Sequence, residues 1–230
     1  MATTSGSVLP GAHVGGTLRL LLGAGLFVAA VALGLAIALA NVPYFEFVNR
    51  FVGASDAVPR GLLFSSWLLL LGGPVVLWRP AAFGVQLGGL RHQWPAVAFT
   101  LTGAALATAV LLRATGTTPY SDASMFIEVV VVPITEELVF RGVLLTALLL
   151  AFARLFSPGS GVLLAVAANG MAFGAAHLAN ALDLPLTFVA AQVVFATVLG
   201  MGCAVLMLRT RSLYAAIVLH GVVNAVVVMV

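Results

Sequence analysis

The chain has 230 residues, of which 62% are hydrophobic and only 7% are charged. A soluble domain of this length carries about 25% charged residues, so the composition excludes a soluble globular protein and predicts an integral membrane protein. The formal net charge of +3 comes from arginines spread along the chain. They form no dense basic patch, which argues against a nucleic-acid partner.

The apolar stretches are too long and too uniform for the strands of a β-barrel, and they predict helices. The N-terminus lacks the basic region of a signal peptide, so we expect the first stretch to be a retained span. Residues 41–60 place aromatic residues beside Arg50 and Arg60, which indicates an interfacial connection. In chain order the expected spans are residues 17–40, 61–78, 96–112, 123–152, 161–179, 187–208 and 213–230.

We therefore expect an all-α membrane protein, a polytopic bundle of about seven transmembrane helices, with six to eight as the range. It would form a single integral membrane domain over residues 1–230 and lie in the cell membrane as a multi-pass protein. The single cysteine, Cys203, lies in an apolar span. It allows no disulfide within one chain, and we interpret it as a small buried hydrophobic residue.

The span over residues 123–152 carries the pattern Glu136-Glu137-x-x-x-Arg141, just after Pro133, which predicts a kink. Ionisable groups cost about 2.5–3.5 kcal/mol each in hydrocarbon, so three in one span indicate a function. On a helix Glu137 and Arg141 are one turn apart on the same face and can pair. Glu136 lies about 100° away from Glu137. The pattern thus predicts one structural and one working carboxylate.

Two later spans each carry a pair at the same four-residue spacing: Phe173 with His177, and His220 with Asn224. Intramembrane polar side chains usually point into the bundle, so the three spans predict one shared polar cavity. Taken singly, His220 is equally well explained as a core histidine. Asn224 is equally well explained as a polar contact between helices. We interpret Phe173 as a packing residue beside the site.

A third acid of the same span, Glu128, lies two turns before Glu136, and we interpret it as structural, at the cavity or an interface. A carboxylate and an imidazole that share one water make a general base. A second imidazole and an amide are donors for a developing oxyanion. This set of groups suits hydrolysis of an amide by water. A GxSxG motif is absent from the sequence, which weakens a serine mechanism.

Over residues 123–228, EELVFR, FGAAH and HGVVN resemble, in order, the three motifs of the CPBP family of intramembrane proteases. This family includes the type II CAAX prenyl endopeptidases and bacteriocin-processing and immunity proteins. The resemblance implies a helical membrane endopeptidase whose catalytic core is residues 123–228. It implies that Glu136 and His177 activate water and that His220 with Asn224 forms the oxyanion hole. Glu137, Arg141 and Phe173 would support them.

The family has also been described as metalloproteases. We expect no required cofactor, but a zinc-dependent version of the same protease stays open, with His177, His220 and Glu136 as ligands. The expected partners are the lipid bilayer and a membrane protein, a peptide or a lipidated substrate. Bacteria generally lack prenylated CAAX substrates, so for a bacterial chain, which we expect, the substrate is open.

Two other functions compete with the protease. One is a non-catalytic immunity or scaffold protein on the same frame, and the other is a proton-coupled transporter, in which intramembrane Glu and His are also expected. All three motifs are present, which favours the enzyme. The sequence has no evident inverted repeat, which counts against the transporter.

Overall fold

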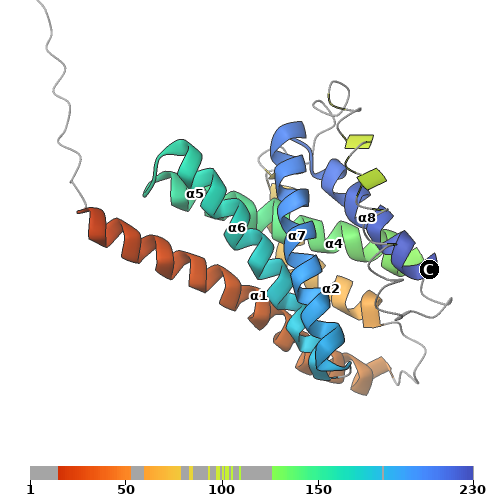
Figure 1. The fold of residues 1–230 in the computed structure, drawn as a ribbon. Coiled ribbons are helices and arrows are strands. Elements are labelled where there is room, and N and C mark those ends of the chain that lie inside the picture. Colours follow the sequence, from red (N-terminus) through yellow and green to blue (C-terminus); the bar gives the residue numbers. More distant parts are fainter. Residues whose placement is uncertain are drawn as a thin grey trace, which may run out of the picture.

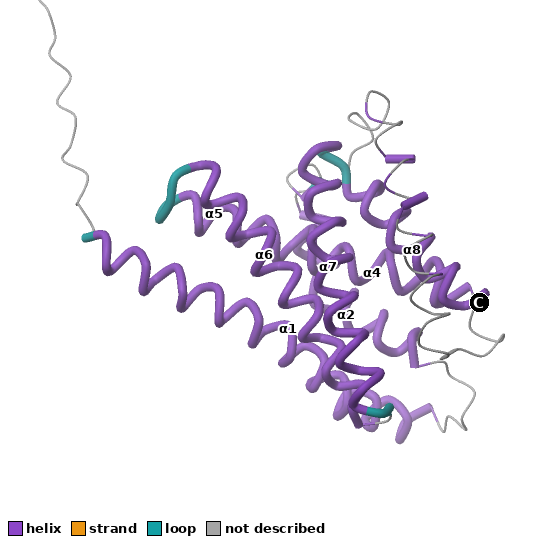
Figure 2. The backbone as a smooth tube through the Cα atoms, in the orientation of Figure 1, coloured by secondary structure: helices purple, strands orange, loops and turns teal. Residues whose placement is uncertain are grey.

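The computed structural model describes residues 15–52, 60–78, 126–182 and 184–229, with isolated positions between 83 and 109. These ranges are helical, and they contain no strand. The bundle is shown in Figure 1, and Figure 2 shows that short loops join the later helices. The expectation of an all-α architecture is confirmed for this part of the chain.

The first helix, α1 (Gly16–Val52), has 37 residues, and it continues through Pro43. The sequence had predicted that the first span ends at residue 40, which is wrong, because the helix continues to Val52. The interfacial position predicted for residues 41–60 stays a prediction. Tyr44 explains the extension. Its hydroxyl is 2.8 Å from Ser66 Oγ, and its ring lies 5.4 Å from that of Trp67. Both partners belong to α2 (Arg60–Trp78), so α2 holds the extended end of α1.

The predicted span over residues 123–152 is one helical run from residue 126 to residue 153. Its hydrogen bonding changes along the run, because two π-helical segments enclose a short α-helix that contains Pro133 and both glutamates. Its segments are η3 (Ile127–Val131), α4 (Val132–Glu137), η4 (Leu138–Leu145) and α5 (Thr146–Ala153).

The last part of the chain follows the predicted spans closely. After a turn that ends at Ser157, α6 (Pro158–Ala176) leads into the 3-10 helix η5 (His177–Leu182). The long helix α7 (Leu186–Thr210) and α8 (Leu213–Met229) complete the bundle.

Length and composition allow three helices of the described chain to cross a membrane: Gly16–Val48, Pro158–Leu182 and Leu186–Thr210. Shorter apolar helices cover Ser65–Trp78 and Leu213–Val227. The run with the glutamates is divided into short α and π segments. The predicted span over residues 96–112 falls largely outside the described residues. The count of seven spans therefore stays a prediction.

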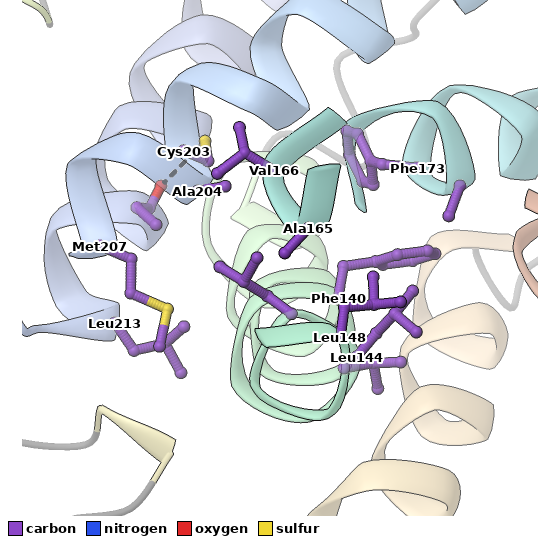
Figure 3. Close-up of a cluster of buried hydrophobic side chains, with 14 of the residues drawn as sticks. Phe140, Leu144, Leu148, Ala165, Val166, Phe173, Cys203, Ala204, Met207 and Leu213 are labelled. Carbon is purple, nitrogen blue, oxygen red and sulfur yellow. Dashed lines mark hydrogen bonds between the residues drawn. The ribbon is translucent and has the colours of Figure 1, made fainter. Parts of the chain in front are cut away.

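The glutamate-bearing run is the centre of the packing. The segments α4 and η4 contact α2, and α8 packs against η3 and α4, while α6 lies between α1 and α7. Figure 3 shows the apolar core that these helices share, with Phe140, Leu144, Phe173 and Met207 among its side chains. Cys203 is fully buried there, and its thiol lies 3.8 Å from the carbonyl of Ala216. The interpretation of Cys203 as a buried core residue is confirmed.

Glycine allows α6 and α7 to approach closely. A Cβ atom added at Gly170 would lie 2.8 Å from the carbonyl oxygen of Thr197 and 3.1 Å from the backbone nitrogen of Met201. Neither backbone atom can turn aside as a side chain would. Close approach through small residues is the usual way in which helices associate in a membrane.

We predict that Gly170→Ala lowers the melting temperature in detergent, because α6 and α7 must move apart; overpacking typically costs about 1–3 kcal/mol. Gly202→Ala is the matched control, because a Cβ atom there meets nothing within 4 Å. That control should melt at or above the wild-type temperature, since alanine favours a helix by about 1 kcal/mol over glycine. Equal melting of the two variants would contradict the close contact.

Candidate active site

The two adjacent glutamates both point into the bundle. Glu136 is 7% exposed and Glu137 is fully buried, as is Arg141. Arg141 Nη1 lies 3.0 Å from Glu137 Oε1, one helical turn away. The predicted ion pair is therefore present. Its distance is that of a contact ion pair, but its angles are not those of a hydrogen bond: within the described residues the guanidinium nitrogens make none.

Phe173 accommodates the buried guanidinium. The central carbon of Arg141 lies 4.2 Å from the centre of the Phe173 ring, which is cation–π distance. Gly200 of α7 leaves the space for this stack, because a Cβ atom there would lie 2.9 Å from Arg141 Nη2. Phe173 thus packs beside the site, as expected, and it also contacts the charge.

His220 connects the two glutamates. Its Nδ1 lies 2.9 Å from Glu137 Oε1, and its Nε2 lies 3.6 Å from Glu136 Oε2. Sequence reasoning missed the first contact and assigned Glu137 to Arg141 alone. An ionised carboxylate only accepts hydrogen bonds, so with Glu137 ionised, Nδ1 of His220 carries the proton. The second distance exceeds a hydrogen bond, so His220 Nε2 faces Glu136 without being bonded to it.

His177 joins this group through Phe173. Its Nδ1 lies 2.9 Å from the Phe173 carbonyl oxygen, where α6 changes into η5. The Phe173 ring makes T-shaped contacts with two histidine rings. Its centre lies 5.0 Å from the centre of the His177 ring and 5.6 Å from that of the His220 ring. Because Nδ1 is bonded to the backbone, Nε2 is the nitrogen of His177 that a proton-transfer role would use.

Asn224 lies one turn beyond His220 on α8 and is half-buried. Its amide nitrogen donates to the carbonyl oxygen of Glu128 at 2.8 Å. An amide nitrogen carries two hydrogens, so one remains for a second acceptor. The carbonyl of Glu128 is thus tied to α8, and Glu128 itself is half-buried.

Two polar contacts beside the motif residues were not foreseen. Thr135 donates to Ser65 Oγ at 3.1 Å, which links the turn before Glu136 to α2. Asn169 of α6 donates to the carbonyl oxygen of Phe140 at 2.6 Å and is fully buried. The sequence held a signal for Asn169, since it lies four residues before Phe173 and eight before His177, on the same helical face.

A metal site needs several donor side chains close together. Within the described ranges, no three His, Cys, Asp or Glu side chains are grouped so that they could hold an ion. His177, His220 and Glu136, the alternative zinc ligands, therefore do not form such a group. The contacts of Nδ1 of His220 with Glu137 and of Nδ1 of His177 with a carbonyl are of the kind that metal-binding histidines also make, so they do not count against a metal. On the spacing of the described donors alone, no step below passes through a metal.

We predict that Glu137→Gln lowers thermal stability in detergent, because Arg141 becomes an unpaired buried charge; breaking such a pair costs about 3–5 kcal/mol in soluble proteins. The double variant Glu137→Gln/Arg141→Met removes both charges and should melt higher than the single variant. Glu136→Gln should melt close to wild type. The reverse order, with Glu136→Gln unstable and Glu137→Gln unchanged, would show that the two glutamates have the opposite roles.

The comparisons with known proteins concern the segment that contains this site. A family model described as Rce1-like, type II CAAX prenyl endopeptidase Rce1-like, matches residues 116–226. The match covers slightly less than half of the chain and contains all of the motif residues. No curated protein and no solved structure matches the chain. Residues 116–226 are therefore similar to the Rce1-like type II CAAX prenyl endopeptidases, and this match supports membership of the CPBP family.

Proposed function

We propose that this protein is an intramembrane endopeptidase that hydrolyses a peptide bond near the membrane face with a water molecule activated by Glu136 and His177. The observation that carries the proposal is the meeting of Glu136 and His220, 3.6 Å apart, in a buried site within the family-matched segment. His177 adjoins them across the ring of Phe173. A carboxylate and an imidazole can both act as general bases; Glu136 and His177 would take that role, while His220, which faces Glu136, would serve the oxyanion.

In the proposed reaction, Glu136 with His177 takes a proton from water as its oxygen attacks the scissile carbonyl carbon. The carbonyl oxygen becomes an oxyanion. The base then returns the proton to the leaving nitrogen as the C–N bond breaks. No covalent enzyme intermediate is formed, and the products are a carboxylic acid and an amine.

His220 and Asn224 are the proposed oxyanion donors. Nδ1 of His220 is bonded to Glu137, so an N–H at Nε2 requires the imidazolium form. Asn224 has one amide hydrogen beyond the one bonded to Glu128. Both donors lie one turn apart on α8, so they can reach the same oxygen, whose charge appears only in the transition state.

The proposed substrate is a membrane protein or a lipidated peptide, because the motif residues lie in apolar helices. Burial in the bundle also keeps bulk water from the site, which strengthens the electrostatic effect of each donor.

We predict that Glu136→Gln abolishes turnover and leaves the fold intact, because the amide keeps the shape and loses the base. His177→Ala should also abolish turnover, and Asn224→Ala should lower the rate by about 10²–10³, as is typical for one oxyanion donor. The assay is cleavage of a quenched peptide library by purified protein in detergent, with melting curves for each variant. Full turnover by folded Glu136→Gln would refute the proposal.

We also predict that activity survives exhaustive chelation, because the proposed mechanism draws its base and its donors from side chains. The measurement is the rate before and after chelator treatment, with the metal content of the protein determined in parallel. Activity that is lost in the chelator and restored by stoichiometric zinc, together with zinc found in the purified protein, would instead support the metal-dependent protease.

A further inference from the structure

The helical turn with both glutamates is unusual in its surroundings. It is the last turn of α4, and π-helical segments lie on both sides of it, η3 before and η4 after. A π-helical segment changes the i→i+4 ladder to i→i+5, and such segments are rare and occur frequently at functional sites. The direction in which the glutamates point therefore depends on how these two segments are held.

Each π-helical segment is tied to another helix by an asparagine. Asn224 of α8 donates to the carbonyl oxygen of Glu128 in η3, at 2.8 Å. Asn169 of α6 donates to the carbonyl oxygen of Phe140 in η4, at 2.6 Å. The atom of Asn169 in this contact is the nitrogen, because a carbonyl oxygen only accepts. The two asparagines thus clamp the glutamate turn from either side.

The clamp at Phe140 leads directly to the proposed active site. Phe140 precedes Arg141, and its ring makes a T-shaped contact with the ring of Phe173, with 5.1 Å between the ring centres. Arg141 stacks on the same ring and pairs with Glu137. Glu137 binds His220 Nδ1, which directs Nε2 towards Glu136. Each step in this path is a contact between neighbouring side chains, and every one of these residues is buried.

We propose that Asn169 is a positioning residue of the active site: its amide fixes the backbone of η4 at Phe140 and so sets where Arg141 and Glu137 hold His220. This inference rests on the function proposed above. Asn169 does not touch the reacting atoms in this account. Its loss should disturb the orientation of His220 and leave substrate binding largely unchanged. An Asn169 that served only to join α6 to η4 would affect stability alone.

The first test separates turnover from binding. Asn169→Leu keeps the volume and removes the donor. We expect kcat to fall about 10- to 100-fold with KM within about twofold, since small displacements of catalytic groups have effects of this size. Tyr44→Phe is the control, because it also removes a hydrogen bond between two helices, α1 and α2. Its kcat should equal that of wild type.

The second test needs no activity. The chain has four histidines, so ¹⁵N-histidine NMR of the full chain in micelles gives few signals, and His220→Gln identifies those of His220. In wild type and Tyr44→Phe, Nδ1 of His220 should show the shift of a hydrogen-bonded N–H. In Asn169→Leu the Nδ1 and Nε2 shifts of His220 should change. If Asn169→Leu does not fold, Asn169→Ala is measured in the same way.

The outcomes are distinct. A folded Asn169 variant with wild-type kcat and an unchanged His220 spectrum would overturn the positioning role. A variant with lowered kcat and an altered His220 spectrum would support it. If wild-type protein cleaves no peptide, the proposed function fails, and the NMR comparison alone decides whether Asn169 orients His220.

Discussion

The carboxylate of Glu137 is the constraint on which the site depends. It is fully buried, and one of its oxygens lies within 3.0 Å of Arg141 and within 2.9 Å of His220. A buried charge without partners costs several kcal/mol. The burial of Glu137 therefore requires that Arg141 and His220 stay beside it. Through Arg141 it secures η4, and through His220 it secures α8. The Glu137 carboxylate therefore holds η4 and α8 together. In its contact with α8, Glu137 and His220 lie 83 positions apart in the sequence.

The surrounding helices are shaped to accept this charge. Arg141 is buried because Phe173 offers the face of its ring and because Gly200 has no side chain. The glycine of α7 and the aromatic ring of α6 are thus parts of one pocket for a guanidinium. Gly170 lets the same two helices approach closely enough to form it. The packing of α6 on α7 and the electrostatics of the site are consequences of the same small residues.

Much of the site was predictable because its chemistry is local. A spacing of four residues identifies a shared helical face, so the pair Glu137–Arg141 and the contact of His177 with Phe173 followed from the sequence alone. The resemblance to the family placed Glu136, His177, His220 and Asn224 in one site. The structure brings His220 to Glu136, and it links His177 to His220 through Phe173. Their catalytic roles and the cavity itself stay predictions.

What the sequence did not predict depends on contacts between helices. The extension of α1 beyond residue 40 is held by the contacts of Tyr44 with Ser66 and Trp67. The sequence around Tyr44 does not predict these contacts. The π-helical segments on either side of the glutamates were not predicted either, because hydropathy shows only that the run is apolar. Asn169 carried a weak signal, a polar residue in an apolar span, but its partner is a backbone carbonyl, which no side-chain motif records.

The two neighbouring glutamates have different surroundings, which suits the different roles proposed for them. Adjacent residues on a helix diverge by about 100°, yet His220 lies between them and meets both. Glu137 is paired with Arg141 and is bonded to Nδ1 of His220. Glu136 lies 3.6 Å from Nε2 of the same ring, and in the proposed mechanism it is the base. There a single carboxylate could not do both, because a carboxylate held in an ion pair cannot also take up the proton of water. The proposed roles are therefore an anchor for Glu137 and a base for Glu136, and the histidine between them contacts each with a different nitrogen.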